Sequence, residues 1–348
     1  MTLAMTLNKR VMVNLSSRAV SPEGARMTSP RRIAVLATGG TIACTLDAQG
    51  QLVKTLRAAD LLRTVPPIEG LDVRPSDYDQ LSSWNMTPAA MLELVHRIDD
   101  LLISCESVVV THGTDTLEET AAFLSFALRS SAPVVVTGAM RTSDELGADG
   151  ARNLSSALLV AADPDARGRG TLVVFDDQVH RGVAVTKRHT SAAAAFCSPN
   201  SGPIGRVHDG SVTFTELPTA PTRYEVRHAD ADVPLLLATP GAPVRIVEAA
   251  LAGADGLVVA GFGLGHLPPA WMELLGEAVR SGIPVVMTTR TYAGPVYGRY
   301  AGPGGDIDAR ERGLIPAGYR TPQAARIQLI CALGAGQDPT DAFTPLRP

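Results

Sequence analysis

The chain has 348 residues, of which 45% are hydrophobic, and its 35 acidic and 31 basic side chains leave a formal net charge of -4. This composition is typical of a globular protein with a large core, and it excludes an intrinsically disordered chain. Because no excess of positive charge is available to neutralise phosphates or anionic lipids, we expect no nucleic acid among its partners.

The N-terminal segment lacks the uninterrupted apolar stretch of a signal peptide. We therefore expect residues 1–30 to form a disordered arm, with Met27 as an alternative start of the chain. No run of the sequence approaches the ~20 apolar residues of a membrane span, so we expect no membrane partner and residence in the cytoplasm.

The cysteines stand far apart, without the spacing of a disulfide framework or of a structural zinc site. The histidines show no ligand spacing either, and GFGLGHLPP at 261–269 lacks the third glycine of a dinucleotide-binding loop. We therefore expect free thiols, no metal and no cofactor. The four cysteines are Cys44, Cys105, Cys197 and Cys331.

Short apolar runs rich in β-branched residues recur along the chain, bounded by glycine, proline or polar residues. Such runs are typical of strands buried on both faces of a parallel sheet. They are RIAVLAT (32–38), SVVVTH (107–112), APVVVTG (132–138), TLVVFDD (171–177), VPLLLAT (233–239), DGLVVAG (255–261) and IPVVMTT (283–289).

Segments with helical spacing lie between these runs, at 87–102, 115–129 and 151–163, and a last one lies at 321–333. Thr87 and Thr321 each precede a proline, which marks two helix starts. Alternation of strands and helices predicts an α/β fold, whose ligand sites lie beyond the carboxyl ends of the strands.

Two domains are predicted by the length and by a change in composition. Near 216–234 the sequence loses its periodicity and gains proline and charge, which is typical of a linker. We expect a larger catalytic domain at 31–217, a linker at 218–233 and a smaller α/β domain at 234–348. The glycine- and tyrosine-rich stretch at 290–320 is either a functional loop or a surface excursion.

Two threonine-rich turns follow predicted strands, LATGGTIA at 36–43 and VVVTHGTDTLEET at 108–120. Glycines let each backbone turn tightly, so that Thr41 in the first turn and Thr114 and Asp115 in the second present polar groups at the sheet edge. In the alternative interpretation, Thr114 or Asp115 only caps the next helix. A phosphate cradle is a further alternative, but neither turn matches its motifs.

A threonine hydroxyl becomes a useful nucleophile only when a neighbouring group takes its proton. Lys187, in VAVTKRHT, is a candidate base that Asp115 would orient, because a partly buried lysine loses its charge more readily than a solvated one. A solvated surface charge is the alternative for Lys187. His112 is a second candidate base, although packing within the sheet is the expected state of a histidine at a strand end.

The two turns also carry a resemblance to a known family. TGGTIA and THGTDTLEETA look like the two signature motifs of the bacterial L-asparaginase and glutaminase-asparaginase family of threonine-dependent amidohydrolases. The resemblance covers nearly everything from 32 to 335. Further similar stretches are PVVVTGAMR (133–141), ADGARNL (148–154), VTK (185–187) and, more weakly, TPQAARI.

The resemblance implies catalytic roles for four residues. Thr41 would attack the side-chain amide carbon of L-asparagine and form an acyl-enzyme, releasing ammonia before hydrolysis to L-aspartate. Thr114, Asp115 and Lys187 would form the second catalytic group, which transfers protons. Glutamine is a second candidate substrate, and no metal or cofactor takes part.

The resemblance also implies the residues that bind the substrate. Ser83 would hold the α-carboxylate and Asp115 the α-amino group, and Ala139 would offer backbone contacts near the amide. Thr114 is also among the implied substrate-binding residues. Trp84 stands where the family usually has a glutamine, at the carboxylate end of the pocket.

This sequence departs from the family pattern in two further places. The segment that follows the first turn, 43–62, contains no counterpart of the usual lid tyrosine, and the 290–301 loop has no clear counterpart of the glutamate donated across the subunit interface.

The family further implies a larger flavodoxin-like domain and a homotetramer built as a dimer of dimers. Two alternative functions follow from the same resemblance. One is a catalytically impaired amino-acid-binding homologue. The other is the ammonia-supplying subunit of a tRNA-dependent amidotransferase, although such subunits carry an extra N-terminal domain for which 30 residues are too few.

Overall fold

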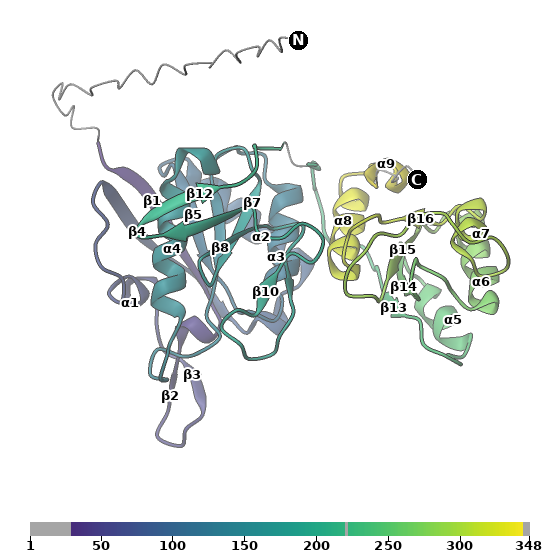
Figure 1. Ribbon diagram of the computed structural model, residues 1–348, viewed down its shortest axis with the longest axis horizontal. Coiled ribbons are helices and arrows are strands. Elements are labelled where there is room, and N and C mark those ends of the chain that lie inside the picture. Colours follow the sequence, from purple (N-terminus) through teal and green to yellow (C-terminus); the bar gives the residue numbers. More distant parts are fainter. Residues whose placement is uncertain (1–28, 220–221, 344–348) are drawn as a thin grey trace, which may run out of the picture.

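The computed structural model describes residues 29–219 and 222–343, which form two α/β domains that lie side by side (Figure 1). The larger N-terminal domain contains an eight-stranded sheet with the order β12-β11-β8-β7-β6-β5-β1-β4. The smaller C-terminal domain contains a four-stranded sheet with the order β13-β14-β15-β16. The predicted two-domain α/β fold class is therefore confirmed.

The large sheet is parallel from β4 to β7 and antiparallel beyond β7. Its parallel strands are β1 (Arg31–Gly39), β4 (Leu71–Leu81), β5 (Ser107–Thr111), β6 (Val134–Thr137) and β7 (Thr171–Phe175). Its antiparallel strands are β8 (Gln178–Arg181), β11 (Gly205–His208) and β12 (Ser211–Phe214). Two short ribbons lie outside it, β2 (Cys44–Leu46) with β3 (Leu52–Lys54), and β9 (Thr186–Lys187) with β10 (Phe196–Cys197).

Helices cover both faces of the large sheet because successive side chains of its central strands point to opposite faces. Ala34 and Leu36 of β1 pack with α2 and α3, whereas Ile33 and Val35 pack with α4. The helices of this domain are α1 (Ala58–Leu62), α2 (Pro88–Leu102), α3 (Leu117–Ala127) and α4 (Gly150–Ala162), with short 3₁₀ turns at Thr41–Ala43, Ser83–Asn85 and Pro164–Ala166.

The small sheet is parallel throughout, and α8 lies between it and α3 of the large domain. Its strands are β13 (Leu235–Leu237), β14 (Leu257–Gly261), β15 (Val285–Thr289) and β16 (Ile315–Pro316). The helices are α5 (Arg245–Leu251), α6 (Pro269–Arg280), α7 (Asp306–Glu311), α8 (Pro322–Gly334) and α9 (Pro339–Ala342).

All seven expected strands and all four expected helices are present, and Thr87 and Thr321 cap α2 and α8 by accepting hydrogen bonds from Ala90 and Ala324. The expected burial on both faces is wrong for β13, because this edge strand exposes 37% of Leu235 and 55% of Leu237. Most of the expected N-terminal arm lies outside the described residues. In the described part of the chain, no helix is both long and apolar enough to cross a membrane.

The segment 222–234 forms neither helix nor strand, as its composition suggested. It is nevertheless packed in place: the Tyr224 amide donates to the Phe126 carbonyl at 2.8 Å, and the two rings meet edge to face. Tyr224 is only 3% exposed. The connection therefore belongs to the core that α3 and α8 share.

Candidate active site

The two threonine turns touch each other because β1 and β5 are adjacent parallel strands whose carboxyl ends meet at one edge of the sheet. Gly40 has a φ of 85°, and a Cβ placed on it would lie 2.4 Å from the Cα of Gly113. Only glycines permit this approach. Thr38 Oγ1 also donates to the Thr111 carbonyl at 3.0 Å, which ties the two strand ends together.

Ser83 closes a third side of this junction. A Cβ on Gly113 would lie 2.6 Å from Ser83 Oγ, and the Thr116 hydroxyl donates to the Ser83 carbonyl at 2.7 Å. Ser83 is 5% exposed, whereas the next residue, Trp84, is 72% exposed. The short 3₁₀ turn therefore holds Ser83 beside Gly113 and leaves Trp84 at the surface.

The turn after β6 supplies the neighbouring wall. A Cβ on Gly138 would lie 2.5 Å from the His112 carbonyl and 3.6 Å from Thr114 Cγ2. Ala139 follows and is fully buried. Three turns that follow neighbouring strands thus converge on the residues around Thr114.

Lys187 reaches this junction from the short strand β9. Its Nζ donates to Thr114 Oγ1 at 2.8 Å and to Asp115 Oδ1 at 2.7 Å. The Lys187 side chain is 17% exposed and that of Asp115 is 53% exposed. Lys187 is therefore not a solvated surface charge, and Asp115 retains accessible surface beyond its contact with the lysine.

The helix-cap interpretation of Thr114 and Asp115 is wrong. Helix α3 starts at Leu117, with Thr116 at the N-cap position and no side-chain cap hydrogen bond. The polar groups of Thr114 and Asp115 instead meet the Lys187 ammonium.

His112 is packed within the sheet, as expected of a histidine at a strand end. It is 1% exposed, its Nδ1 donates to the Gly113 carbonyl at 2.7 Å, and its Nε2 accepts from the Thr120 hydroxyl at 3.2 Å. Burial lowers the pKa of His112 to about 4, so the ring is neutral near pH 7. Both ring nitrogens are already engaged in structural hydrogen bonds, which removes His112 as the proton acceptor.

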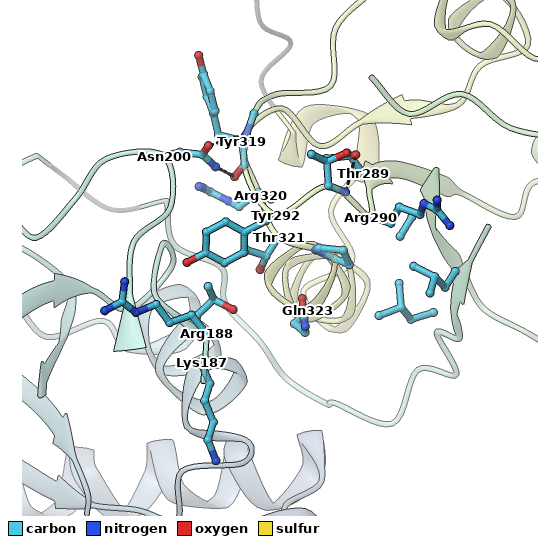
Figure 2. Close-up of a pocket in the computed structure, with 17 residues that line it drawn as sticks. Lys187, Arg188, Asn200, Thr289, Arg290, Tyr292, Tyr319, Arg320, Thr321 and Gln323 are labelled. Atoms are coloured by element: carbon cyan, nitrogen blue, oxygen red, sulfur yellow. Dashed lines mark hydrogen bonds between the residues drawn. The ribbon is translucent and has the colours of Figure 1, made fainter. Parts of the chain in front are cut away.

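A cavity of about 500 Å³ lies between the domains, lined by Lys187, Arg188, Tyr292 and Arg320 among others. The Lys187 side chain extends away from the other labelled lining residues (Figure 2). Its ammonium instead meets Thr114 and Asp115, so this cavity is distinct from the junction of the threonine turns.

The ribbon β2–β3 follows Thr41 directly and projects from the domain (Figure 1). The Leu46 amide ties it to Asp144 Oδ2 at 2.7 Å. The side chains near its tip are exposed, with Leu52 at 56%. The segment 43–62, in which the family usually has its lid tyrosine, therefore begins with a short hairpin and ends in α1.

All four cysteines are free thiols, as predicted. Among residues 29–219 and 222–343, no three His, Cys, Asp or Glu side chains are grouped closely enough to hold a metal ion.

Sequence reasoning missed Glu118 and Thr116. The Glu118 carboxylate accepts the main-chain N–H of Lys187 at 2.8 Å, and the Thr116 hydroxyl holds Ser83. Both residues stand within the second motif, but hydroxyl and carboxylate residues are so frequent there that no local signal distinguishes them.

Fold and site together define a two-domain α/β enzyme whose polar site lies where two threonine turns meet a lysine. Comparison with known protein families supports this assignment to a two-domain class of enzymes. Residues 32–220 match the Asparaginase, N-terminal family model, and residues 232–343 match the Glutaminase/Asparaginase C-terminal domain. The chain belongs to the asparaginase family, which confirms the resemblance of its motifs.

Relatives cover most of the chain. A probable L-asparaginase of Deinococcus radiodurans is 40% identical over 316 residues, covering 89% of this chain and 95% of the relative. L-asparaginase 2 of Escherichia coli is 33% identical over 336 residues, covering 93% and 95%. A subunit of the glutamyl-tRNA(Gln) amidotransferase of Haloquadratum walsbyi is 33% identical over 345 residues, covering 95% of this chain and 77% of the relative.

Proposed function

We propose that the protein hydrolyses L-asparagine to L-aspartate and ammonia through a threonine acyl-enzyme. The observation that supports this most directly is the contact of Lys187 Nζ with Thr114 Oγ1 at 2.8 Å, beside the glycine junction that carries Thr41. A hydroxyl, an amine and a carboxylate at one junction are the groups that acyl transfer requires. Several relatives named L-asparaginase give independent support.

In the proposed course, the Thr41 oxygen attacks the amide carbon of the substrate. Its proton passes to the group formed by Thr114, Lys187 and Asp115, in which the Lys187 amine is the proposed base. The tetrahedral intermediate collapses with cleavage of the C–N bond, and the departing nitrogen takes a proton to leave as ammonia. Water, activated by the same group, then cleaves the Thr41 ester and releases aspartate.

Substrate binding follows from the charges of an α-amino acid. The exposed part of the Asp115 carboxylate suits the α-ammonium, and Ser83, which lies beside Gly113, suits the α-carboxylate. The main chain at Ala139 would contact the side-chain amide, and Trp84 would border the carboxylate end. Glutamine is one methylene longer than asparagine, so its hydrolysis depends on the room this pocket leaves.

We further propose a homotetramer in the cytoplasm, with a catalytic domain at 31–217, a linker at 218–233 and a second domain at 234–348. One relative, from Haemophilus influenzae, is named a probable periplasmic L-asparaginase. Light scattering of the purified protein and fractionation of the native cells test the assembly and the compartment, and a monomer or an extracytoplasmic protein would contradict these two proposals.

The decisive assay measures ammonia release from asparagine and glutamine side by side. We expect turnover with asparagine and slower turnover with glutamine. Aspartate binding in a calorimeter without ammonia release over hours would favour an amino-acid-binding homologue instead. Copurification with a tRNA-binding partner would favour the kind of amidotransferase component that the Haloquadratum relative represents.

A further inference from the structure

Glu118 is a buried carboxylate on the first turn of α3, 9% exposed. Its Oε2 accepts the main-chain N–H of Lys187 at 2.8 Å, although the two residues are 69 positions apart in the chain. Burial raises the pKa of Glu118, while hydrogen bonds from Thr186 and from the Lys187 amide oppose this shift. The Glu118 carboxylate therefore links the start of α3 to strand β9.

Strand β9 needs such a link because it has little support of its own. It contains only Thr186 and Lys187, it lies outside the large sheet, and it pairs with the equally short β10. The next amide, of Arg188, donates to the Ala195 carbonyl across this ribbon at 2.7 Å, whereas the Lys187 amide donates to α3. Glu118 is therefore the anchor on the side of β9 that faces away from β10.

The same stretch of chain holds Lys187 at both of its ends. Thr114 and Asp115 accept hydrogen bonds from Nζ, and Glu118, three residues after Asp115, accepts the one from the main-chain nitrogen. With both ends fixed to one rigid segment, the lysine side chain has little freedom to move its amine away from Thr114.

We propose that Glu118 is a positioning residue, whose carboxylate fixes the main chain of Lys187 so that its amine stays within hydrogen-bonding distance of Thr114. This inference rests on the proposed role of Lys187 in proton transfer. Displacement of a reacting group by about 1 Å can lower a rate by about 10²-fold, so the loss of this anchor is expected to act on kcat.

Glu119 is a matched control within the same helix turn. It is also a largely buried glutamate, but it makes no hydrogen bond to Lys187, and its Oε2 is buried without a partner among the described residues. Methionine is similar in size to glutamate, so replacing either glutamate by methionine removes a buried carboxylate and largely keeps the side-chain volume. Only the replacement of Glu118 removes the acceptor for Lys187.

The test compares Glu118→Met, Glu118→Gln and Glu119→Met. In Glu118→Met we expect kcat for asparagine to fall about 10²-fold with KM changed less than about threefold, and the Lys187 amide to exchange its hydrogen faster. Glu118→Gln keeps an oxygen acceptor and is expected to stay within about tenfold of wild type. Glu119→Met is expected to leave both readouts unchanged.

Two results would overturn the proposal: equal kcat in the two methionine variants, or unchanged amide exchange at Lys187 in Glu118→Met. If Glu118→Met does not fold, Glu118→Asp takes its place in both measurements, because the shorter aspartate side chain keeps the charge but moves the acceptor away from the Lys187 amide. The same two results in Glu118→Asp would then overturn the proposal. A wild-type protein that releases no ammonia would refute the proposed function, and amide exchange would still decide whether Glu118 holds Lys187.

Discussion

At the scale of single residues, the site depends on a lysine that is largely removed from water and paired with one hydroxyl and one carboxylate. Lys187 is 17% exposed and donates to Thr114 and Asp115. A lysine amine can lose its proton, whereas an arginine guanidinium stays charged at any pH a protein tolerates. The two cations are therefore not equivalent at this position.

Replacement of Lys187 tests this difference. Lys187→Met removes the proton acceptor, and Lys187→Arg keeps a cation that does not deprotonate, so we expect both to lower kcat for asparagine by about 10² to 10⁴-fold. Arg188→Met is the control, because the Nε of Arg188 donates to the Ala194 carbonyl rather than to Thr114 or Asp115. Steady-state ammonia release gives the comparison, and an arginine variant as active as wild type would exclude proton transfer by Lys187.

At the scale of elements, the two glycine turns determine where the hydroxyls lie. Gly40 combines a left-handed φ of 85° with a closest approach of 2.4 Å between its hypothetical Cβ and Gly113 Cα. Gly50, in the turn of the β2–β3 hairpin, has a similar φ of 74° but nothing within 4 Å. A side chain at Gly50 would therefore cause backbone strain alone, whereas a side chain at Gly40 would cause backbone strain and a steric clash.

Alanine substitutions at these glycines measure the clash. Gly50→Ala is expected to lower the free energy of unfolding by about 1 kcal/mol through the left-handed conformation alone. Gly40→Ala adds a backbone clash, so we expect a loss of roughly 3 kcal/mol or more and a fall of about 10²-fold in kcat. Urea unfolding with ammonia kinetics checks both, and equal effects of the two substitutions would show that the turns do not need this contact.

The predictable elements are those with a strong local signal. β1, β5, β6 and β7 were predicted because they are continuous apolar runs buried on both faces. β4 was missed because it is an edge strand with polar, exposed positions along its length. The two-residue strands β9 and β10 have too few residues to produce any periodicity.

The site was predictable only in part for a related reason. Thr41, Thr114 and Asp115 follow recognisable strands, so their place at the sheet edge follows from the fold class. The contact of Lys187 with Thr114 spans 73 residues, and that with Glu118 spans 69. Such contacts depend on tertiary packing, so the sequence alone leaves Lys187 as either a candidate base or a solvated surface charge.

At the scale of the whole molecule, the start of α3 joins the candidate site residues Thr114 and Asp115 to the boundary between the domains. Helix α3 packs against α8 of the C-terminal domain, and Glu119 lies near Arg326 of that helix. Burial, and next the neighbouring charge of Glu118, raise the pKa of Glu119 to about 7 from 4.5. The folded protein therefore binds this proton more tightly than the unfolded chain does.

The consequence is a loss of stability with rising pH. The contribution of Glu119 is fully present below pH 4.5, and it is lost as the pH rises toward about 7. Glu119→Gln should remove this pH-dependent loss of unfolding free energy, which is of the order of 1–3 kcal/mol. The difference in unfolding free energy between variant and wild type, measured from pH 4.5 to 7.5, checks it.

Glu225→Gln serves as the control for this pH series, since its side chain is 60% exposed. We expect the Glu225 variant to follow the pH dependence of the wild type. A Glu119 variant that also follows the wild-type curve would mean that the buried carboxyl does not titrate in this window.

The central claim is that two hydroxyls, from two touching turns, carry out one amide hydrolysis. The most direct measurement is ammonia release from asparagine by Thr41→Ala and by Thr114→Ala, each compared with wild type after circular dichroism has established an intact fold. We predict that each single substitution abolishes ammonia release, because one hydroxyl attacks and the other transfers protons. Retained activity in both folded variants would contradict this account.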